Sequence, residues 1–159
     1  MTQDRGLTHV DETGAARMVD VSAKDASTRR AVASGKVLVS AEVVEALRGE
    51  GVPKGDALAV ARIAGIMGAK RTPDLVPLCH PIAITGAKVD LEVADDAVLI
   101  TAAVKTTDRT GVEMEALTAV AVAGLAVIDM VKALDPAAVL SDVRVERKEG
   151  GKTGLWVRS

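Results

Sequence analysis

The stretch GVEMEALTAVAVAGLAVIDMVKALD, residues 111–135, decides the fold. No charged residue occurs between Ala116 and Ile128, and the apolar residues fall on every side of a helix rather than on one stripe. A helix that is apolar all round is buried all round. Because the uncharged run is too short to span a bilayer, the sequence predicts a core helix rather than a membrane span.

The charged residues of this helix lie near its two ends, Glu113 and Glu115 at the start and Asp129 and Lys132 at the close. Glu115 and Asp129 are fourteen residues apart, which is roughly 21 Å at about 1.5 Å of rise per residue. One helix cannot bring both carboxylates to one small reacting atom. Either they serve different parts of an extended ligand, or a second subunit supplies one of them.

These charges also have structural explanations. Acidic residues are favoured near a helix N-terminus by the helix dipole, and this is the interpretation we prefer for Glu113 alone. Asp129 and Lys132 are spaced i,i+3 and can form an ion pair that stabilises the helix by roughly 0.2–0.5 kcal/mol. Charges that interrupt an oily helix are seldom buried unless they are paired or functional, so we favour a chemical role for this pair.

Composition limits the class of protein. The chain has 159 residues, enough for one domain with a sizeable core, and that core must be aliphatic because there is one Trp and no Phe or Tyr. A net charge of −2 and the lack of stacking aromatics argue against nucleic-acid binding. A single Cys is typical of a reducing compartment, and the N-terminus shows no apolar signal segment. We therefore expect a soluble cytoplasmic protein that does not bind membranes.

Local patterns predict the other elements. Helices are expected at 41–48 after the N-cap Ser40, and from about 56 to 70 with Asp56 as a cap. Thr110 is a plausible N-cap of the central helix. Strands are expected at 37–39, 87–93, 97–104, 139–145 and 155–157, with a hairpin at 94–96 and a strand or extended arm at 18–22. The pattern predicts a flexible segment at 1–16 and a single α+β domain at 17–159, an antiparallel sheet with helices on one face.

A stiff connection carries the only Cys and the only His outside the N-terminal segment. Residues 72–81 contain three prolines and are expected to be rigid and non-helical. Cys79 and His80 lie in this connection, which makes it a good place for chemistry. A lone Cys is nevertheless more often a small buried hydrophobe than a nucleophile, and His80 could simply hydrogen-bond the backbone.

The remaining polar residues suggest an anionic ligand. One Cys and two His are too few for a zinc site, and no dinucleotide fingerprint is present, so we expect neither a metal nor a cofactor. Lys54 beside Gly55 precedes a helix and could form an anion site. If the scattered cations converge, they suit a small polyphosphate; they are Arg29, Lys54, Lys70, Arg71, Lys132, Lys148 and Lys152.

Three segments carry a resemblance to a known family. They are KGDALAVARIAGIMGAKRTPDLVPLCHPI (54–82), TGVEMEALTA (110–119) and DMVK (129–132). Together they resemble the molybdenum cofactor biosynthesis protein C family (MoaC), the cyclic pyranopterin monophosphate synthases. THVDETGAARMVDVSAK (8–24) and GGKTG (150–154) match as well, so the resemblance covers nearly the whole chain in order.

This resemblance implies a ferredoxin-like fold and a homohexamer, a trimer of dimers with the site at a subunit interface. The residues agree independently, since one sheet cannot cover every side of a helix that is apolar all round. The implied enzyme is a phosphorus–oxygen lyase of molybdopterin synthesis. It converts a cyclised dihydroguanosine triphosphate into cyclic pyranopterin monophosphate and releases diphosphate. Whether Mg²⁺ accompanies the triphosphate is left open.

The resemblance also implies roles for individual residues. Asp129 would be the catalytic acid/base, with Lys132 and Lys54 as its partners. Arg109 stands where relatives often have lysine, and its role and that of Lys152 are left open. The other matched positions would bind the substrate: Leu78, Cys79, His80, Glu113, Met114 and Glu115 along its length, and Lys70, Arg29 and Lys148 at its phosphates.

Two other classes of function compete with the lyase. A non-catalytic, nucleotide-sensing oligomer could use the same fold, because fold alone does not fix function. A purely structural oligomer would leave Lys54, His80 and Asp129 without a role.

Overall fold

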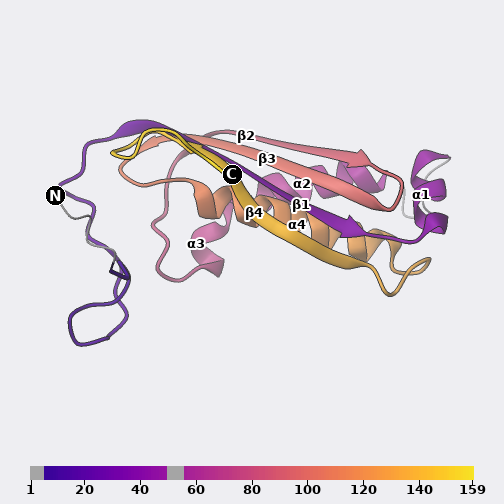
Figure 1. Cartoon of the computed structure of the whole chain (residues 1–159), viewed down its shortest axis with the longest axis horizontal. Coiled ribbons are helices and arrows are strands. Elements are labelled where there is room, and N and C mark those ends of the chain that lie inside the picture. The colour runs from indigo at the N-terminus through magenta and orange to yellow at the C-terminus, as the bar shows by residue number, and fades with distance from the viewer. Residues whose placement is uncertain (1–5, 50–55) are drawn as a thin grey trace.

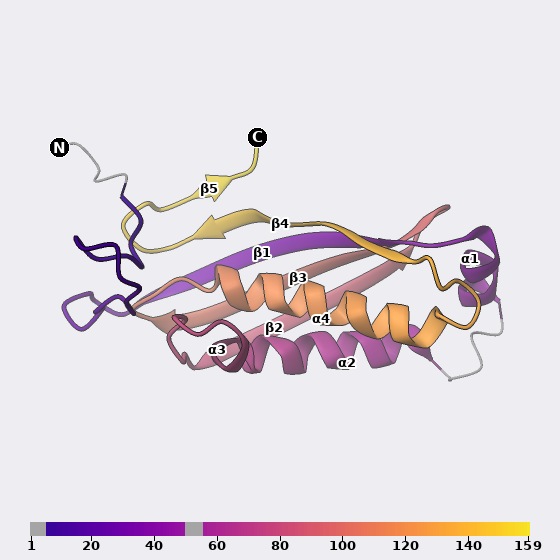
Figure 2. The same cartoon turned by 90° about the horizontal axis from the view of Figure 1, so that it is seen from below.

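The computed structural model describes residues 6–49 and 56–159, so Lys54 lies outside the described residues. Five strands form one antiparallel sheet in the order β2-β3-β1-β4-β5. The helices α2 and α4 lie against one face of it (Figures 1 and 2). The elements are β1 (Ser27–Leu38), α1 (Ala41–Arg48), α2 (Ala57–Lys70), α3 (Thr72–Leu75), β2 (Ile84–Val93), β3 (Ala97–Asp108), α4 (Glu113–Val131), β4 (Val139–Glu149) and β5 (Trp156–Val157).

This arrangement confirms the predicted α+β fold with helices on one face. The succession β1-α2-β2-β3-α4-β4, with β1 and β3 at the centre of the sheet, is the ferredoxin-like topology. The hairpin predicted at 94–96 joins β2 to β3. The boundary proposed at residue 16 stays a prediction.

The first strand is much longer than the sequence pattern indicated. We expected a strand only at 37–39, but β1 begins at Ser27, and Ala31, Ala33 and Gly35 all face the core. A Cβ at Gly35 would lie 2.7 Å from Cγ1 of Val120 on α4. The inward residues of β1 are small because α4 packs directly on them, and small residues carry a weak strand signal.

The two long helices approach each other closely. A Cβ at Gly65 of α2 would lie 2.9 Å from the backbone oxygen of Ala119 on α4, and one at Gly68 would lie 2.8 Å from Cβ of Val122. The small residues of α2 therefore let α4 approach it closely.

The prediction that α4 is buried on every side is wrong for the single chain. Its inner face packs on the sheet, but Leu125 is 59% exposed, and Ile63 and Met67 on α2 are also exposed. By length and composition α4 could cross a membrane, yet half of its apolar window is buried against the rest of the chain, as in a core helix. That a second subunit covers the outer face stays a prediction.

Helix termini provide further tests. The side chains of Ser40 and Asp56 accept hydrogen bonds from the backbone of Val43 and Ala59, which confirms both predicted caps. Thr110 is not the cap of α4; Val112 occupies that position, and no side chain caps the helix.

Two connections differ from expectation. Residues 72–75 form the single helical turn α3 instead of a non-helical link, because a proline in the first turn of a helix leaves no backbone donor unsatisfied. Residues 18–22 belong to no strand and form an extended arm with a turn, one of the two forms we allowed.

Candidate active site

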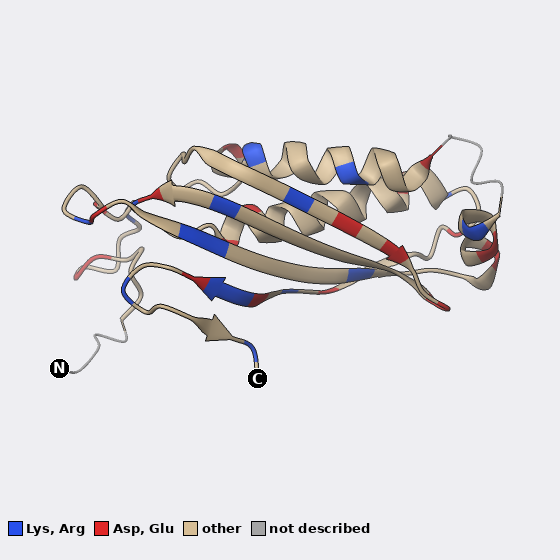
Figure 3. Cartoon of the chain, turned by 90° about the horizontal axis from the view of Figure 1, so that it is seen from above, with Lys and Arg blue, Asp and Glu red and all other residues tan. Residues whose placement is uncertain are grey.

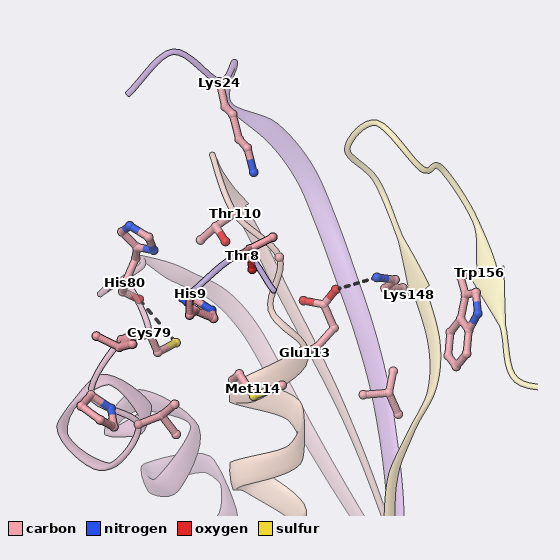
Figure 4. A pocket seen from close by; sticks show the side chains of 15 residues that line it. Thr8, His9, Lys24, Cys79, His80, Thr110, Glu113, Met114, Lys148 and Trp156 are labelled. Carbon is pink, nitrogen blue, oxygen red and sulfur yellow. Dashed lines mark hydrogen bonds and ion pairs between the residues drawn. The ribbon is translucent and has the colours of Figure 1, made fainter. Parts of the chain in front are cut away.

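A cavity of about 980 Å³ opens where α4 begins, at the end of the sheet (Figure 4). Its walls come from four parts of the chain: the N-terminal segment, the 76–80 connection, the start of α4 and the β4–β5 pair. The lining residues are Thr8, His9, Lys24, Val76, Pro77, Leu78, Cys79, His80, Thr110, Gly111, Glu113, Met114, Val145, Lys148 and Trp156.

A thiol and a buried carboxyl group form a polar contact beside this cavity. The Cys79 Sγ donates a hydrogen bond to Oε2 of Glu115 at 3.5 Å. Glu115 is only 1% exposed, and its other oxygen has no hydrogen-bond partner among the described residues. Burial is the main cause that raises the pKa of Glu115, and burial followed by the Glu115 charge raises the pKa of Cys79 to about 11.

The shift at Cys79 is large enough to indicate the state of the thiol. Cys79 is a neutral thiol near neutral pH and therefore a poor nucleophile, because the thiolate is the reactive form. Burial of Glu115 raises the pKa of its carboxyl group and so disfavours its ionised form.

A carboxylate–ammonium pair crosses the cavity. Oε1 of Glu113 lies 3.4 Å from Nζ of Lys148 on β4. Gly111 lies directly beneath the Glu113 carboxylate, and any Cβ there would overlap it. A smaller hollow of about 90 Å³ shares Gly111, Glu113 and Lys148 with the cavity and adds Arg29 from β1. Basic residues therefore lie on neighbouring stretches of β1 and β4 beside the cavity (Figure 3).

Two contacts hold the N-terminal arm beside the 76–80 connection and β3. Nε2 of His80 donates a hydrogen bond to the backbone oxygen of Val19 at 2.6 Å. Nε of Arg109 donates to the backbone oxygen of Lys24 at 3.0 Å. Arg109, whose role the sequence left open, therefore holds the segment that carries Lys24 to the cavity.

The predicted acid/base pair lies at the opposite end of α4. Nζ of Lys132 is 2.8 Å from Oδ1 of Asp129, and both side chains are 59% exposed. Neither residue lines the cavity, and neither does Lys70, which is exposed at the end of α2.

Within one chain, therefore, the structure gathers only part of the predicted site. Six predicted substrate-binding residues line the cavity: Leu78, Cys79, His80, Glu113, Met114 and Lys148. Glu115 lies behind Cys79, and Arg29 lies in the adjoining hollow. Sequence reasoning assigned no site role to Thr8, His9, Lys24, Thr110 or Trp156, which also line the cavity. Thr8, His9, Lys24 and Thr110 lie in the segments 8–24 and 110–119 that carried the family resemblance. Trp156 was a second signal, because it is the only Trp in a chain without Phe or Tyr.

The MoaC family profile matches residues 18–151, most of the chain and most of these cavity walls. The chain belongs to the MoaC family. That membership agrees with the resemblance drawn from the LCHP and GVEMEAL segments. It does not by itself assign a role to any residue, so the individual roles stay predictions.

Several proteins are similar to this chain over nearly its whole length. A protein of Streptomyces avermitilis named cyclic pyranopterin monophosphate synthase is 76% identical over 99% of this chain and 92% of its own length. A protein of the same name from Streptomyces coelicolor is 74% identical, with the same coverage. A Mycobacterium tuberculosis protein named cyclic pyranopterin monophosphate synthase 2 is 58% identical over 96% of this chain and 91% of its own length.

Proposed function

We propose that this MoaC-family chain is a cyclic pyranopterin monophosphate synthase. It is a lyase that converts a cyclised dihydroguanosine triphosphate into cyclic pyranopterin monophosphate and diphosphate in molybdenum cofactor biosynthesis. The observation that carries the proposal is the convergence of the 78–80 segment, Glu113, Met114 and Lys148 on one cavity. The printed names of the relatives support it.

The size and charge of the cavity suit such a substrate. Its volume of about 980 Å³ is near the upper end of the range typical of small-molecule sites, roughly 300–1,000 Å³. Lys24 and Lys148 line the cavity and Arg29 lies in the adjoining hollow. A triphosphate would therefore meet cations from the N-terminal arm, β4 and β1. Apolar side chains such as Leu78 and Met114 provide a surface for the heterocycle.

The reaction needs protons moved and a phosphoryl group transferred. A hydroxyl of the substrate attacks the α-phosphorus, its proton passes to a base, and the bond from that phosphorus to the departing diphosphate breaks. Asp129 and Lys132 are our candidates for the proton transfers, with Lys54 as a third, because an ammonium beside a carboxylate can exchange protons with substrate. The cations stabilise the charge that develops on the diphosphate.

A second copy of the chain completes this site in our proposal. Asp129 lies fourteen residues from Glu115, which is roughly 21 Å along α4, so in our proposal the acid/base pair of one copy meets the cavity of another. The exposed apolar side chains of α2 and α4, among them Ile63, Met67 and Leu125, support association. We propose a cytoplasmic homohexamer, a trimer of dimers.

Turnover of the cyclised triphosphate tests the proposal. The wild-type chain is expected to form cyclic pyranopterin monophosphate and diphosphate, and Lys132→Ala is expected to slow turnover by about 100-fold or more. Lys88→Ala is the matched control, because Lys88 forms a similarly exposed pair with Asp90, at 3.5 Å on the sheet. Substrate binding without turnover by the wild-type chain would favour the nucleotide-sensing module instead.

A further inference from the structure

We propose that His9 binds the heterocycle of the substrate, and that the N-terminal loop (residues 6–17) positions the His9 side chain at the cavity. This inference rests on the proposed function and adds a specificity-determining residue to it. His9 lines the cavity together with Thr8 and Lys24, although these residues are far in sequence from the walls formed by residues 76–80, 110–114 and 145–156.

The N-terminal loop has its own internal structure. Oδ1 of Asp11 accepts hydrogen bonds from the backbone of Thr13 at 2.9 Å and of Ala15 at 3.0 Å, and from the Thr13 hydroxyl at 2.6 Å. An antiparallel bridge joins Val10 to Ala16 and closes the loop. One carboxylate with three donors therefore sets the path of the backbone, as in the turns that Asp commonly forms.

Arg17 fixes the two residues that face the cavity. Its backbone N–H donates to the carbonyl oxygen of His9 at 2.8 Å, and its Nε donates to the carbonyl oxygen of Thr8 at 3.3 Å. Two residues later, Val19 accepts the hydrogen bond from His80. The loop is thus tied to the 76–80 connection at its base, and the His9 side chain remains exposed to the cavity.

The position of His9 indicates which part of the substrate it meets. In Figure 4 the His9 ring lies on the side of Cys79, whereas the Glu113–Lys148 pair lies on the other side. A neutral imidazole carries one donor and one acceptor. That combination matches the edge of a guanine-derived ring, which presents N–H and C=O groups, while the lysines serve the phosphates.

Substitution of His9 separates this role from a phosphate contact. We expect His9→Ala to lower kcat/KM for the cyclised triphosphate by about tenfold, because a lost hydrogen bond leaves a ring group unpaired. His9→Gln should recover most of the loss, since an amide also offers a donor and an acceptor. His9→Lys should not, because an ammonium has no acceptor.

The same loop supplies the controls. Leu7→Ala is expected to stay within twofold of wild type, since Leu7 is 80% exposed and does not line the cavity. Asp11→Ala should raise KM with little change in kcat or thermal stability, because it releases the loop without touching the substrate.

The His9 variants decide whether the proposed contact exists. His9→Ala within twofold of wild type, or His9→Gln no better than His9→Ala, would overturn the proposed contact, and recovery by His9→Lys alone would assign His9 to the phosphates instead. Failure of the wild-type chain to turn over the substrate would instead reject the proposed function itself. The two failures are thus distinguishable in one set of assays.

Discussion

At the start of α4, Glu115 is 1% exposed and its carboxyl group accepts a hydrogen bond from a thiol. At the end of the same helix, the Asp129 side chain is 59% exposed and forms an ion pair with Lys132. The first end is enclosed by four segments of the chain and forms one wall of a cavity. The second end presents a charged pair to the surface. The start of α4 therefore resembles a binding site without the predicted acid/base pair. The end of α4 carries that predicted pair, away from the cavity.

This difference indicates how a small aliphatic domain can assemble a polar site. Placing all the charges around one cavity of one chain would require burying them together, which is costly unless they are well paired. Distributing the charges along a helix instead leaves each set solvated or paired within one chain. We propose that α4 acts as a spacer, and that association brings the two kinds of end together.

The largest expected effect comes from mixing two inactive chains. Lys132→Ala and Lys148→Ala remove one group from each end of α4, and each is expected to slow turnover strongly, Lys132→Ala by about 100-fold or more. With random mixing, half of the pairs are mixed and each mixed pair holds one intact site, so about a quarter of wild-type turnover should return.

The control for this experiment mixes Lys132→Ala with Asp129→Ala, because both changes lie at the same end and no site can be intact. Equal activity in the two mixtures, with mixed oligomers verified by mass, would show that a site does not combine the two ends.

A second experiment probes the enclosed end through Cys79. Raising the thiol pKa from 9.0 to about 11 lowers the thiolate fraction roughly 100-fold. Each thiolate becomes somewhat more nucleophilic, so alkylation by iodoacetamide at neutral pH should be about tenfold slower in the folded chain than in the chain unfolded by urea. Equal rates would mean that the thiol is not held in a dry, negatively charged environment.

A third experiment follows the buried carboxyl group. Because the folded pKa of Glu115 is raised above its ordinary value of 4.5, the ionised form opposes folding. Wild type should lose stability relative to Glu115→Gln as the pH rises from 4.5 through the folded pKa, with a constant gap above it. Melting temperatures across this range measure the gap, and a difference that does not depend on pH would contradict it.

The smallest expected effect concerns the exposed end. The Asp129–Lys132 pair is solvated on both sides, so Lys132→Ala should change the free energy of unfolding by less than about 0.5 kcal/mol. Urea unfolding of Lys132→Ala and Lys88→Ala gives the comparison. A loss several times larger in Lys132→Ala would assign the pair a structural role and weaken the contrast between the two ends.

Much of the fold followed from local patterns. The core helix, both helix caps at Ser40 and Asp56 and the hairpin at 94–96 could be predicted because each depends on residues within a few positions of one another. The length of β1 could not be predicted from local residues. Its inward residues Ala31 and Gly35 are small for a tertiary reason, the closeness of α4, which no window of the strand itself reveals.

The residues of the site also fall into those that could be predicted from the sequence and those that could not. The 78–80 segment and Glu113 line the cavity as expected, because the family resemblance implied roles for them. His9 lies within the matched segment 8–24, but the resemblance implied no role for it. Its position depends on the Asp11 turn and on Arg17, which act at a distance of several residues. The proposed meeting of Asp129 with the cavity of a second copy stays a prediction, and the spacing of fourteen residues between Glu115 and Asp129 is the sequence feature that led to it.

The position of Trp156 has a practical consequence. It is the only indole in a chain with no Tyr or Phe, it sits on the cavity wall, and the Arg158 guanidinium lies 5.7 Å from its ring centroid. All intrinsic near-ultraviolet emission of the protein therefore originates beside the cavity. Occupancy of the cavity can be followed optically in the unlabelled wild-type chain, with no background from other fluorophores.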